Sequence, residues 1–208
     1  MMDVKFNLYR AEHQGDGELK LYVSLTNGYE REEKEFIVSI KQYAELGGPK
    51  GEISLETYSM IEEAEELHRA IKKGMGILLY GDNTEKRLIQ KLIHHGFSRD
   101  LSEKAVTYLR TIGFVDEEKI AHRVFNAALG KGYGRNRIFA EMIKKGVRRE
   151  IAERVIDEND VDYAKQCAIV IMKKWGTLPT ERVARAKAIR SLLALGYTFD
   201  EININEER

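Results

Sequence analysis

An internal repeat with an offset of 50 residues is the feature that most constrains how this chain can fold. The copies are residues 87–97, 137–147 and 187–197. In each copy, apolar residues stand seven, four and three positions before a glycine, which places them on one face of an α-helix. Glycine ends such a helix well, because it adopts the left-handed conformation without a Cβ clash. The residue after the glycine is expected to fold back on the helix, in the pairs Phe97 with Leu92, Val147 with Met142, and Tyr197 with Leu192.

Apolar residues at helical spacing continue after each glycine and predict further helices. The third helix of the first unit is expected to begin at the N-cap Asp116, and that of the second near Val161 and to close at Trp175. Units of three helices in about 50 residues cannot bury their apolar faces alone, so they are expected to stack. We therefore predict a mainly α fold, with tandem three-helix repeats in an elongated, curved array. The predicted repeats are residues 81–130, 131–178 and a truncated third repeat, 179–208.

The first 80 residues follow another pattern. Polar and apolar side chains alternate between Val4 and Ile40 around the turn signal Asn27-Gly28, which predicts strands. A short helix (41–46) should precede the break at residues 47–49, and Ser54 should cap a helix that ends near Gly74. We predict a small segment containing a β-hairpin at 1–52 and a linking helix region at 53–80.

Composition limits the class of protein. The chain has 208 residues, 43% of them hydrophobic and 33% charged, and its longest apolar runs are far shorter than the roughly 20 residues of a membrane span. The acidic N-terminus lacks the pattern of a signal peptide, and the single cysteine, Cys167, cannot form an internal disulfide. We expect a cytoplasmic protein. The formal net charge is zero, but residues 1–80 carry 10 basic and 15 acidic side chains, whereas residues 81–208 carry 24 and 19.

The strongest candidate for function is a basic stretch in the second unit. Between residues 131 and 150 it holds seven basic side chains against two acidic ones. Gly132 and Gly134 would bring backbone N–H groups to a helix start, Tyr133 offers a stacking face, and arginines can bind phosphates or carboxylates through two hydrogen bonds. The alternative is a solvated helix face behind a glycine-rich connector. We define the first basic surface as Lys131, Tyr133, Arg135, Arg137, Lys144, Lys145, Arg148 and Arg149.

A second basic surface is a weaker candidate, since cations near helix ends are common for reasons of the helix dipole. It comprises Lys173, Lys174, Arg182, Arg185, Lys187 and Arg190. Trp175 follows Ile171 and Met172 at helical spacing, so packing explains it better than binding. We expect Cys167 to act as a small, buried hydrophobic residue.

The sequence offers no set of residues for catalysis. The acidic runs 116–118 and 157–160 lie at helix boundaries, where carboxylates favour the N-terminal dipole. His94 and His95 lie in the last turn of a helix without a cysteine or glutamate at ligand spacing. A phosphate-binding P-loop is excluded, because the Gly-Lys-Ser/Thr ending is absent. We therefore expect a protein that is not an enzyme, with no metal and no cofactor.

Several motifs between about residues 20 and 205 resemble the RecX family of bacterial regulatory proteins. The most specific is Lys131-Gly132-Tyr133-Gly134-Arg135-Asn136-Arg137-Ile138, followed by Lys145-Gly146-Val147. The others are residues 70–80, 85–92 with Gly96-Phe97, 113–121, 36–39, and Leu46-Gly47 with Gly51, Leu55 and Tyr58.

The resemblance implies an array of three-helix repeats that binds the RecA recombinase filament on single-stranded DNA. It also implies restraint of RecA's ATP hydrolysis and strand exchange, in DNA repair, recombination and the SOS response. We expect a monomer whose partners are the RecA nucleoprotein filament and the single-stranded DNA within it, and no membrane.

Two other classes remain open from the residues alone. A nonspecific DNA-binding module of tandem helix-turn-helix units would use the same arginines and would bind free DNA with a steep salt dependence. A protein-docking scaffold of another pathway would have the same helices without needing the first basic surface to face phosphate.

Overall fold

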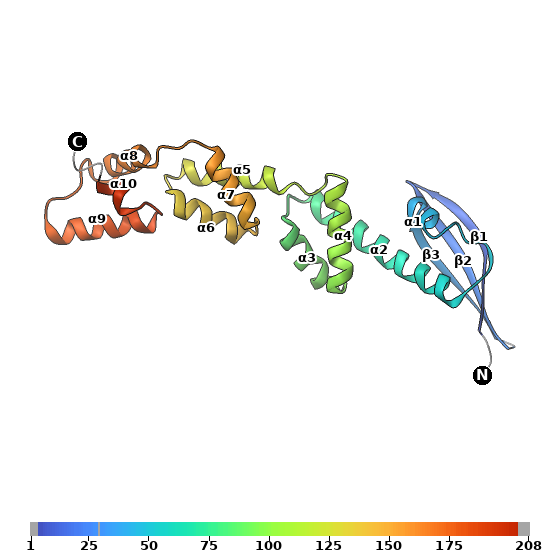
Figure 1. Cartoon of the computed structure of the whole chain (residues 1–208). Coiled ribbons are helices and arrows are strands. Elements are labelled where there is room, and N and C mark those ends of the chain that lie inside the picture. The colour runs from blue at the N-terminus through green and yellow to red at the C-terminus, as the bar shows by residue number, and fades with distance from the viewer. Residues whose placement is uncertain (1–3, 29, 204–208) are drawn as a thin grey trace. The chain divides into compact units, whose positions relative to one another are not determined.

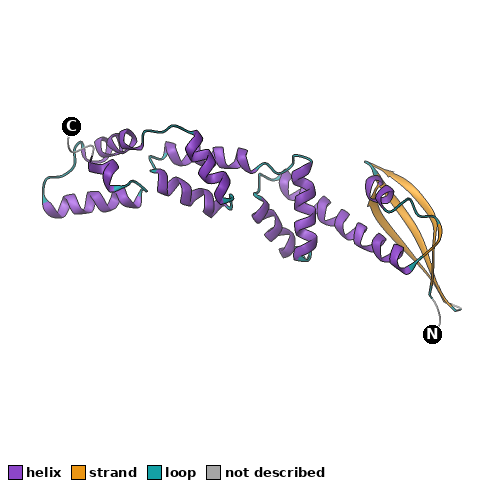
Figure 2. Cartoon of the chain, viewed as in Figure 1, coloured by secondary structure: helices purple, strands orange, loops and turns teal. Residues whose placement is uncertain are grey.

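A computed structural model describes residues 4–28 and 30–203 (Figure 1). The protein is mainly helical, with a small antiparallel sheet at its N-terminal end (Figure 2). It divides into two compact units, one formed by residues up to Gly81 together with 89–114, and the other by residues 82–88 together with 115 onward.

The sheet has four strands: β1 (Lys5–Gly15), β2 (Glu18–Asn27), β3 (Glu30–Ser39) and β4 (Gly51–Ile53), in the order β3-β2-β1-β4. Its pairings are antiparallel. The strands predicted from alternation are present, and Gly28, at φ +63°, lies in the turn between β2 and β3. The strand β4 was not predicted, because three residues after a Gly-Gly-Pro break are too few to show alternation.

Two helices follow the strands. The helix α1 (Ile40–Glu45) begins with a capping box between Ser39 and Gln42, and α2 (Leu55–Leu79) begins at the predicted N-cap, where Ser54 accepts a hydrogen bond from the N–H of Thr57. The α2 side chains Tyr58 and Ile61 join one buried cluster with the inner face of the sheet. That cluster forms the core of the N-terminal part of the first unit.

The predicted end of α2 is wrong. The helix continues through Gly74 to Leu79, and Gly74 is buried inside it. A Cβ on Gly74 would lie 2.6 Å from Leu109 Cδ1 and 4.0 Å from Leu92 Cδ1. This glycine therefore allows close helix packing in the first unit and does not stop the helix.

The remaining helices are α3 (Glu85–His94), α4 (Arg99–Thr111), α5 (Glu117–Gly130), α6 (Arg135–Lys145), α7 (Arg149–Glu158), α8 (Tyr163–Trp175), α9 (Arg182–Ala194) and α10 (Phe199–Asn203). The recurring glycine acts as predicted in all three copies. Gly96, Gly146 and Gly196 have φ values of +94°, +90° and +94°. In each copy the next residue donates its N–H to the carbonyl five positions back, in the expected pairs. Asp116 caps α5 as predicted, and α8 begins after the N-cap Asp162, near the expected position.

The buried clusters of the second unit group these helices in threes. One cluster joins α5, α6 and α7, and another joins α8, α9 and α10. This grouping begins one helix earlier than the ranges deduced from the sequence repeat. In the first unit, Gly74 of α2 likewise lies beside Leu92 of α3 and Leu109 of α4.

Candidate interaction surface

The first basic surface lies on α6 and on the segments that flank it. Lys131 and Tyr133 belong to the connector after α5, four of the other residues are on α6, and Arg148 and Arg149 begin α7. The charged side chains are exposed, whereas Tyr133 is half-buried and packs against the cluster of α5, α6 and α7. Arg137 also lies over the Tyr133 ring, 5.5 Å from its centroid. The stacking face expected at Tyr133 is therefore partly covered.

All four arginines of this surface form ion pairs, and three of them pair with carboxylates on α6 or α7. These three pairs are Arg135 with Asp157 at 2.7 Å, Arg137 with Glu141 at 3.0 Å, and Arg149 with Glu153 at 3.7 Å. Two of these carboxylates are on α7 beyond residue 150, so the count of charges between 131 and 150 did not include them. The first basic surface is consequently less positive than its sequence suggests.

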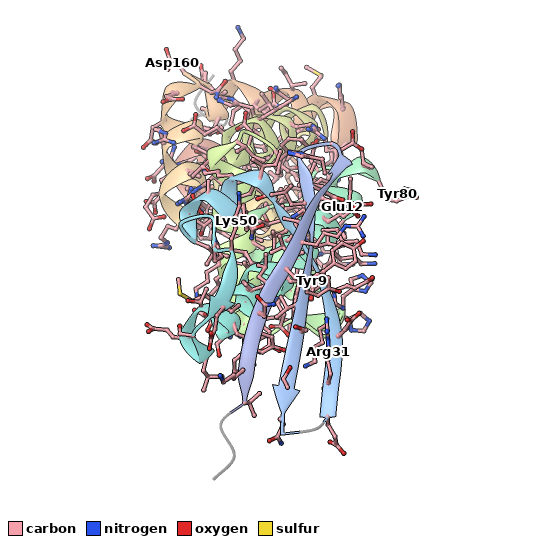
Figure 3. The ribbon with its side chains drawn as sticks, turned by 90° about the vertical axis from the view of Figure 1, so that its right-hand side faces the viewer. Tyr9, Glu12, Arg31, Lys50, Tyr80 and Asp160 are labelled. Atoms are coloured by element: carbon pink, nitrogen blue, oxygen red, sulfur yellow. The ribbon has the colours of Figure 1, made fainter. Side chains whose placement is uncertain are left out.

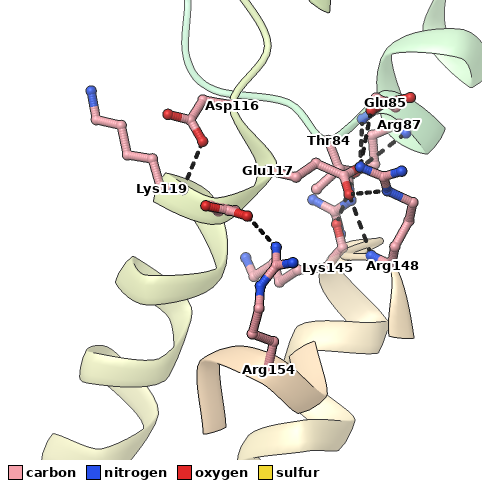
Figure 4. A network of polar contacts seen from close by, with 10 residues as sticks. Thr84, Glu85, Arg87, Asp116, Glu117, Lys119, Lys145, Arg148 and Arg154 are labelled. Carbon is pink, nitrogen blue, oxygen red and sulfur yellow. Dashed lines mark hydrogen bonds and ion pairs between the residues drawn. The ribbon is translucent and has the colours of Figure 1, made fainter. Parts of the chain in front are cut away.

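Arg148 is held by a buried carboxylate. Its Nε donates to Glu117 Oε2 at 3.0 Å, and the Glu117 side chain is 3% exposed (Figure 4). Glu117 Oε1 also accepts from the N–H of Glu85 at 3.1 Å. The hydrogen bond from Arg148 to Glu117 raises the pKa of the guanidinium. From the sequence, the Glu117 carboxylate was expected only to favour the dipole at the start of a helix. Its contacts with residues about 30 positions away could not be predicted from the neighbouring sequence.

The glycines beside the first basic surface connect two packing groups of the second unit. The N–H of Gly134 donates to Leu195 O at 2.8 Å, and that of Asn136 donates to Gly196 O at 3.3 Å. A Cβ on Gly134 would lie 2.6 Å from the Gly196 carbonyl carbon. These N–H groups are occupied within the protein, so the interpretation that Gly134 presents them to a ligand is wrong.

The same junction occurs 50 residues earlier in the chain. Thr84 Oγ1 donates to Lys145 O at 3.4 Å, and a Cβ on Gly146 would lie 2.7 Å from Thr84 Oγ1. Arg87 Nη2 donates to Lys144 O at 3.2 Å. Thr84 corresponds to Gly134, and Gly146 to Gly196, so the internal repeat is also a repeat of contacts.

The remaining cations of the two surfaces are mostly unpaired. Eight of them form no ion pair with a carboxylate in the part of the chain that the structure describes: Lys131, Lys144, Lys145, Lys173, Lys174, Arg182, Lys187 and Arg190. Lys174 instead approaches Ser191 Oγ at 3.3 Å, and Arg190 donates to Ala186 O. Lys131, Lys173 and Lys174 line a single hollow, which joins residues of both basic surfaces.

Other residues singled out from the sequence have packing roles. Trp175 packs against the cluster of α8, α9 and α10, as predicted. Cys167 is fully buried in that cluster, and burial raises the pKa of its thiol to about 11. Among residues 4–28 and 30–203, no three His, Cys, Asp or Glu side chains gather in a way that could hold a metal ion. No helix in the described ranges has the length and apolarity needed to cross a membrane.

Sequence comparison finds curated relatives but no matching family profile. The regulatory protein RecX of Salmonella paratyphi C is 28% identical over 145 residues, which cover 64% of this chain and 87% of the relative. The regulatory protein RecX of Escherichia coli is 29% identical over the same shares.

Two solved structures share the fold. A crystal structure of a regulatory protein RecX covers 98% of this chain and all of its own, with a TM-score of 0.73 and 16% identity. The RecX structure from Lactobacillus salivarius covers 69% of this chain, with a TM-score of 0.59 and 19% identity. The fold defines a class of mainly helical proteins with a small N-terminal sheet and a glycine turn that recurs every 50 residues. In sequence and in fold, this chain is similar to the regulatory proteins RecX.

Proposed function

We propose that this protein acts in the cytoplasm as a regulator of recombination and DNA repair, without catalytic activity of its own. It binds the RecA nucleoprotein filament and inhibits its ATPase and strand exchange. The similarity to regulatory proteins RecX carries this proposal.

Tandem repeats suit such a role, because a row of similar units can contact successive subunits of a filament. We propose that the repeating unit is the packing group of three helices, that is, α2 to α4, α5 to α7 and α8 to α10. The recurrence of the glycine junction at Gly146 and Gly196 supports this division.

The unpaired lysines are the best candidates for the contact, since a lysine without an ion pair can bind phosphate or an acidic surface without losing an internal partner. On the first basic surface these are Lys131, Lys144 and Lys145. The paired arginines would contribute less. Arg148, held by Glu117, would contribute least to a partner.

The test is RecA ATPase on single-stranded DNA, with this protein titrated in at substoichiometric amounts. The double variant Lys144→Glu/Lys145→Glu should inhibit at least tenfold less well. The matched control, Lys119→Glu/Lys165→Glu, changes the charge equally at exposed lysines of the same unit that lie off both surfaces, and it should inhibit like the wild type.

DNA binding without RecA is measured in parallel at physiological salt. Strong inhibition with weak DNA binding supports filament regulation. No inhibition together with tight, salt-sensitive DNA binding would replace the proposal with a nonspecific DNA-binding helical module.

A further inference from the structure

A hollow of about 700 Å³ lies on the second unit between the end of α5 and the helix α8. Its size is in the range of sites for small ligands, about 300–1,000 Å³. Its charged lining consists of Lys131, Lys173 and Lys174, and no carboxylate lines it. The Lys174 ammonium group donates to Ser191 Oγ, outside this lining, whereas Lys131 and Lys173 form no ion pair with a described carboxylate. Lysines without a counter-ion in a concave site favour an anion.

The last carbonyls of α5 do not need these lysines. The N–H groups of Lys131 and Tyr133 donate to Ala128 O, and that of Gly132 donates to Leu129 O. Gln166 Nε2 of α8 donates to Leu129 O as well, at 3.0 Å. The carbonyls of Ala128 and Leu129 are thus already paired with backbone and amide groups, and they do not need the lysines as partners.

Close packing fixes the wall of the hollow. Gly132 has φ +76°, and a Cβ there would lie 2.9 Å from Val170 Cγ2 of α8. Tyr197 Oη donates to Gly132 O at 2.8 Å, which holds the connector in place. Leu129, Ile169 and Val170 add an apolar surface beside the lysines, and Ile169 is 44% exposed.

We propose that this hollow binds the phosphates of a free nucleotide. The ammonium groups contact the phosphates, and the apolar wall receives the sugar or the face of the base. A carboxylate of a partner protein would match the charge of the lysines but would not contact the apolar wall. The proposal goes beyond regulation of RecA, because binding here requires no second protein.

The experiment uses the full chain without RecA. Binding of ATP and of inorganic pyrophosphate is measured by calorimetry, and binding of a fluorescent oligothymidylate by anisotropy. The variants are Lys131→Gln/Lys173→Gln, which removes two positive charges from the hollow, and Lys119→Gln/Lys165→Gln, which removes two elsewhere in the unit. Circular dichroism confirms that both fold, and Lys131→Arg/Lys173→Arg tests rescue by charge.

We expect the variant of the hollow to bind ATP and pyrophosphate about tenfold or more weakly, since each lost charged contact is worth about one such factor. The control and the arginine variant should retain binding. Weaker binding of the oligonucleotide alone would overturn the proposal, because these lysines would then act only as part of a DNA-binding surface. Failure of ATP and pyrophosphate to bind, or equal binding by the variant of the hollow, would overturn it as well. Neither result depends on RecA inhibition, so this site and the regulatory function can fail separately.

Discussion

Gly134 shows how a single missing Cβ brings two packing groups together. Its φ of −78° is open to any residue, so the requirement for glycine is steric. Gly134→Ala would place a methyl group 2.6 Å from the Gly196 backbone, which cannot move away as a side chain could. We expect the free energy of unfolding to fall by about 1–3 kcal/mol, measured by urea denaturation. Gly130→Ala, where a Cβ meets nothing within 4 Å, should not destabilise the protein.

Glu117 is a second residue whose role depends on distant partners. Glu117→Gln keeps the side-chain size but removes the charge that Arg148 contacts inside the second unit. Because the Arg148 side chain is 51% exposed, water compensates in part, and we expect a loss of about 1–2 kcal/mol in urea unfolding. Glu118→Gln removes an exposed pair with Arg154 and should cost less than about 1 kcal/mol. Equal effects of the two changes would contradict the role of the buried carboxylate.

Within one element, α2, two glycines two residues apart should respond in opposite ways to alanine. Gly76 faces open space, so Gly76→Ala should raise the free energy of unfolding by about 0.5–1 kcal/mol through helix propensity. Gly74→Ala gains the same propensity but forces a methyl group against Leu109, and overpacking of about 1–3 kcal/mol should exceed that gain. Thermal unfolding of both variants checks this, and stabilisation by both would show that the packing at Gly74 is loose.

A link between β2 and α2 gives the first unit a dependence on pH. Glu18 Oε1 accepts from Lys72 Nζ at 2.8 Å and lies 3.0 Å from His68 Nε2, and these contacts lower the pKa of Glu18. A carboxyl whose pKa is lower in the folded state stabilises it above the unfolded pKa, and this contribution is lost as the pH falls through the folded pKa.

We therefore expect Glu18→Gln to be less stable than the wild type at pH 7, with a difference that shrinks below about pH 4.5 and is lost as the pH falls through the lowered pKa of the folded state. Urea unfolding across this range measures the difference. The variant Glu30→Gln, at the exposed start of β3, is the control. A difference that stays constant with pH would mean that the ionised carboxyl is not what stabilises the link.

Helices and strands could be predicted from the sequence where neighbouring residues determine where they begin and end. The helix ends at Gly96, Gly146 and Gly196 follow from residues within five positions, and the Ser54 and Asp116 caps from residues within three. The end of α2 was not predictable, because only contacts with two other helices reveal that Gly74 is a packing residue. The strand β4 is fixed by its pairing with β1, more than 40 residues away.

For the whole molecule, charge counted along the chain differs from charge arranged in space. The sequence located the basic residues, but their ion pairs with Asp157, Glu153 and Glu117 required the fold. On the outer face of the sheet, Tyr9 and Arg31 likewise lie together, although they come from β1 and β3 (Figure 3). The 34 basic and 34 acidic side chains give a net charge of zero, yet eight cations of the two basic surfaces form no ion pair with a described carboxylate.

The salt dependence of single-stranded DNA binding would measure how many of these cations are available. Each phosphate contact contributes about 0.7 to the slope of log affinity against log salt. If DNA contacts only the two basic surfaces, the eight unpaired cations set an upper limit near 6, whereas all thirteen cations would give about 9. We expect a slope below about 6, and Lys144→Glu/Lys145→Glu should lower it by between one and two units. A slope near 9 would require the arginine ion pairs to open on DNA. That result would favour the nonspecific DNA-binding module over a filament regulator, because the internal pairs would then be exchanged for phosphate.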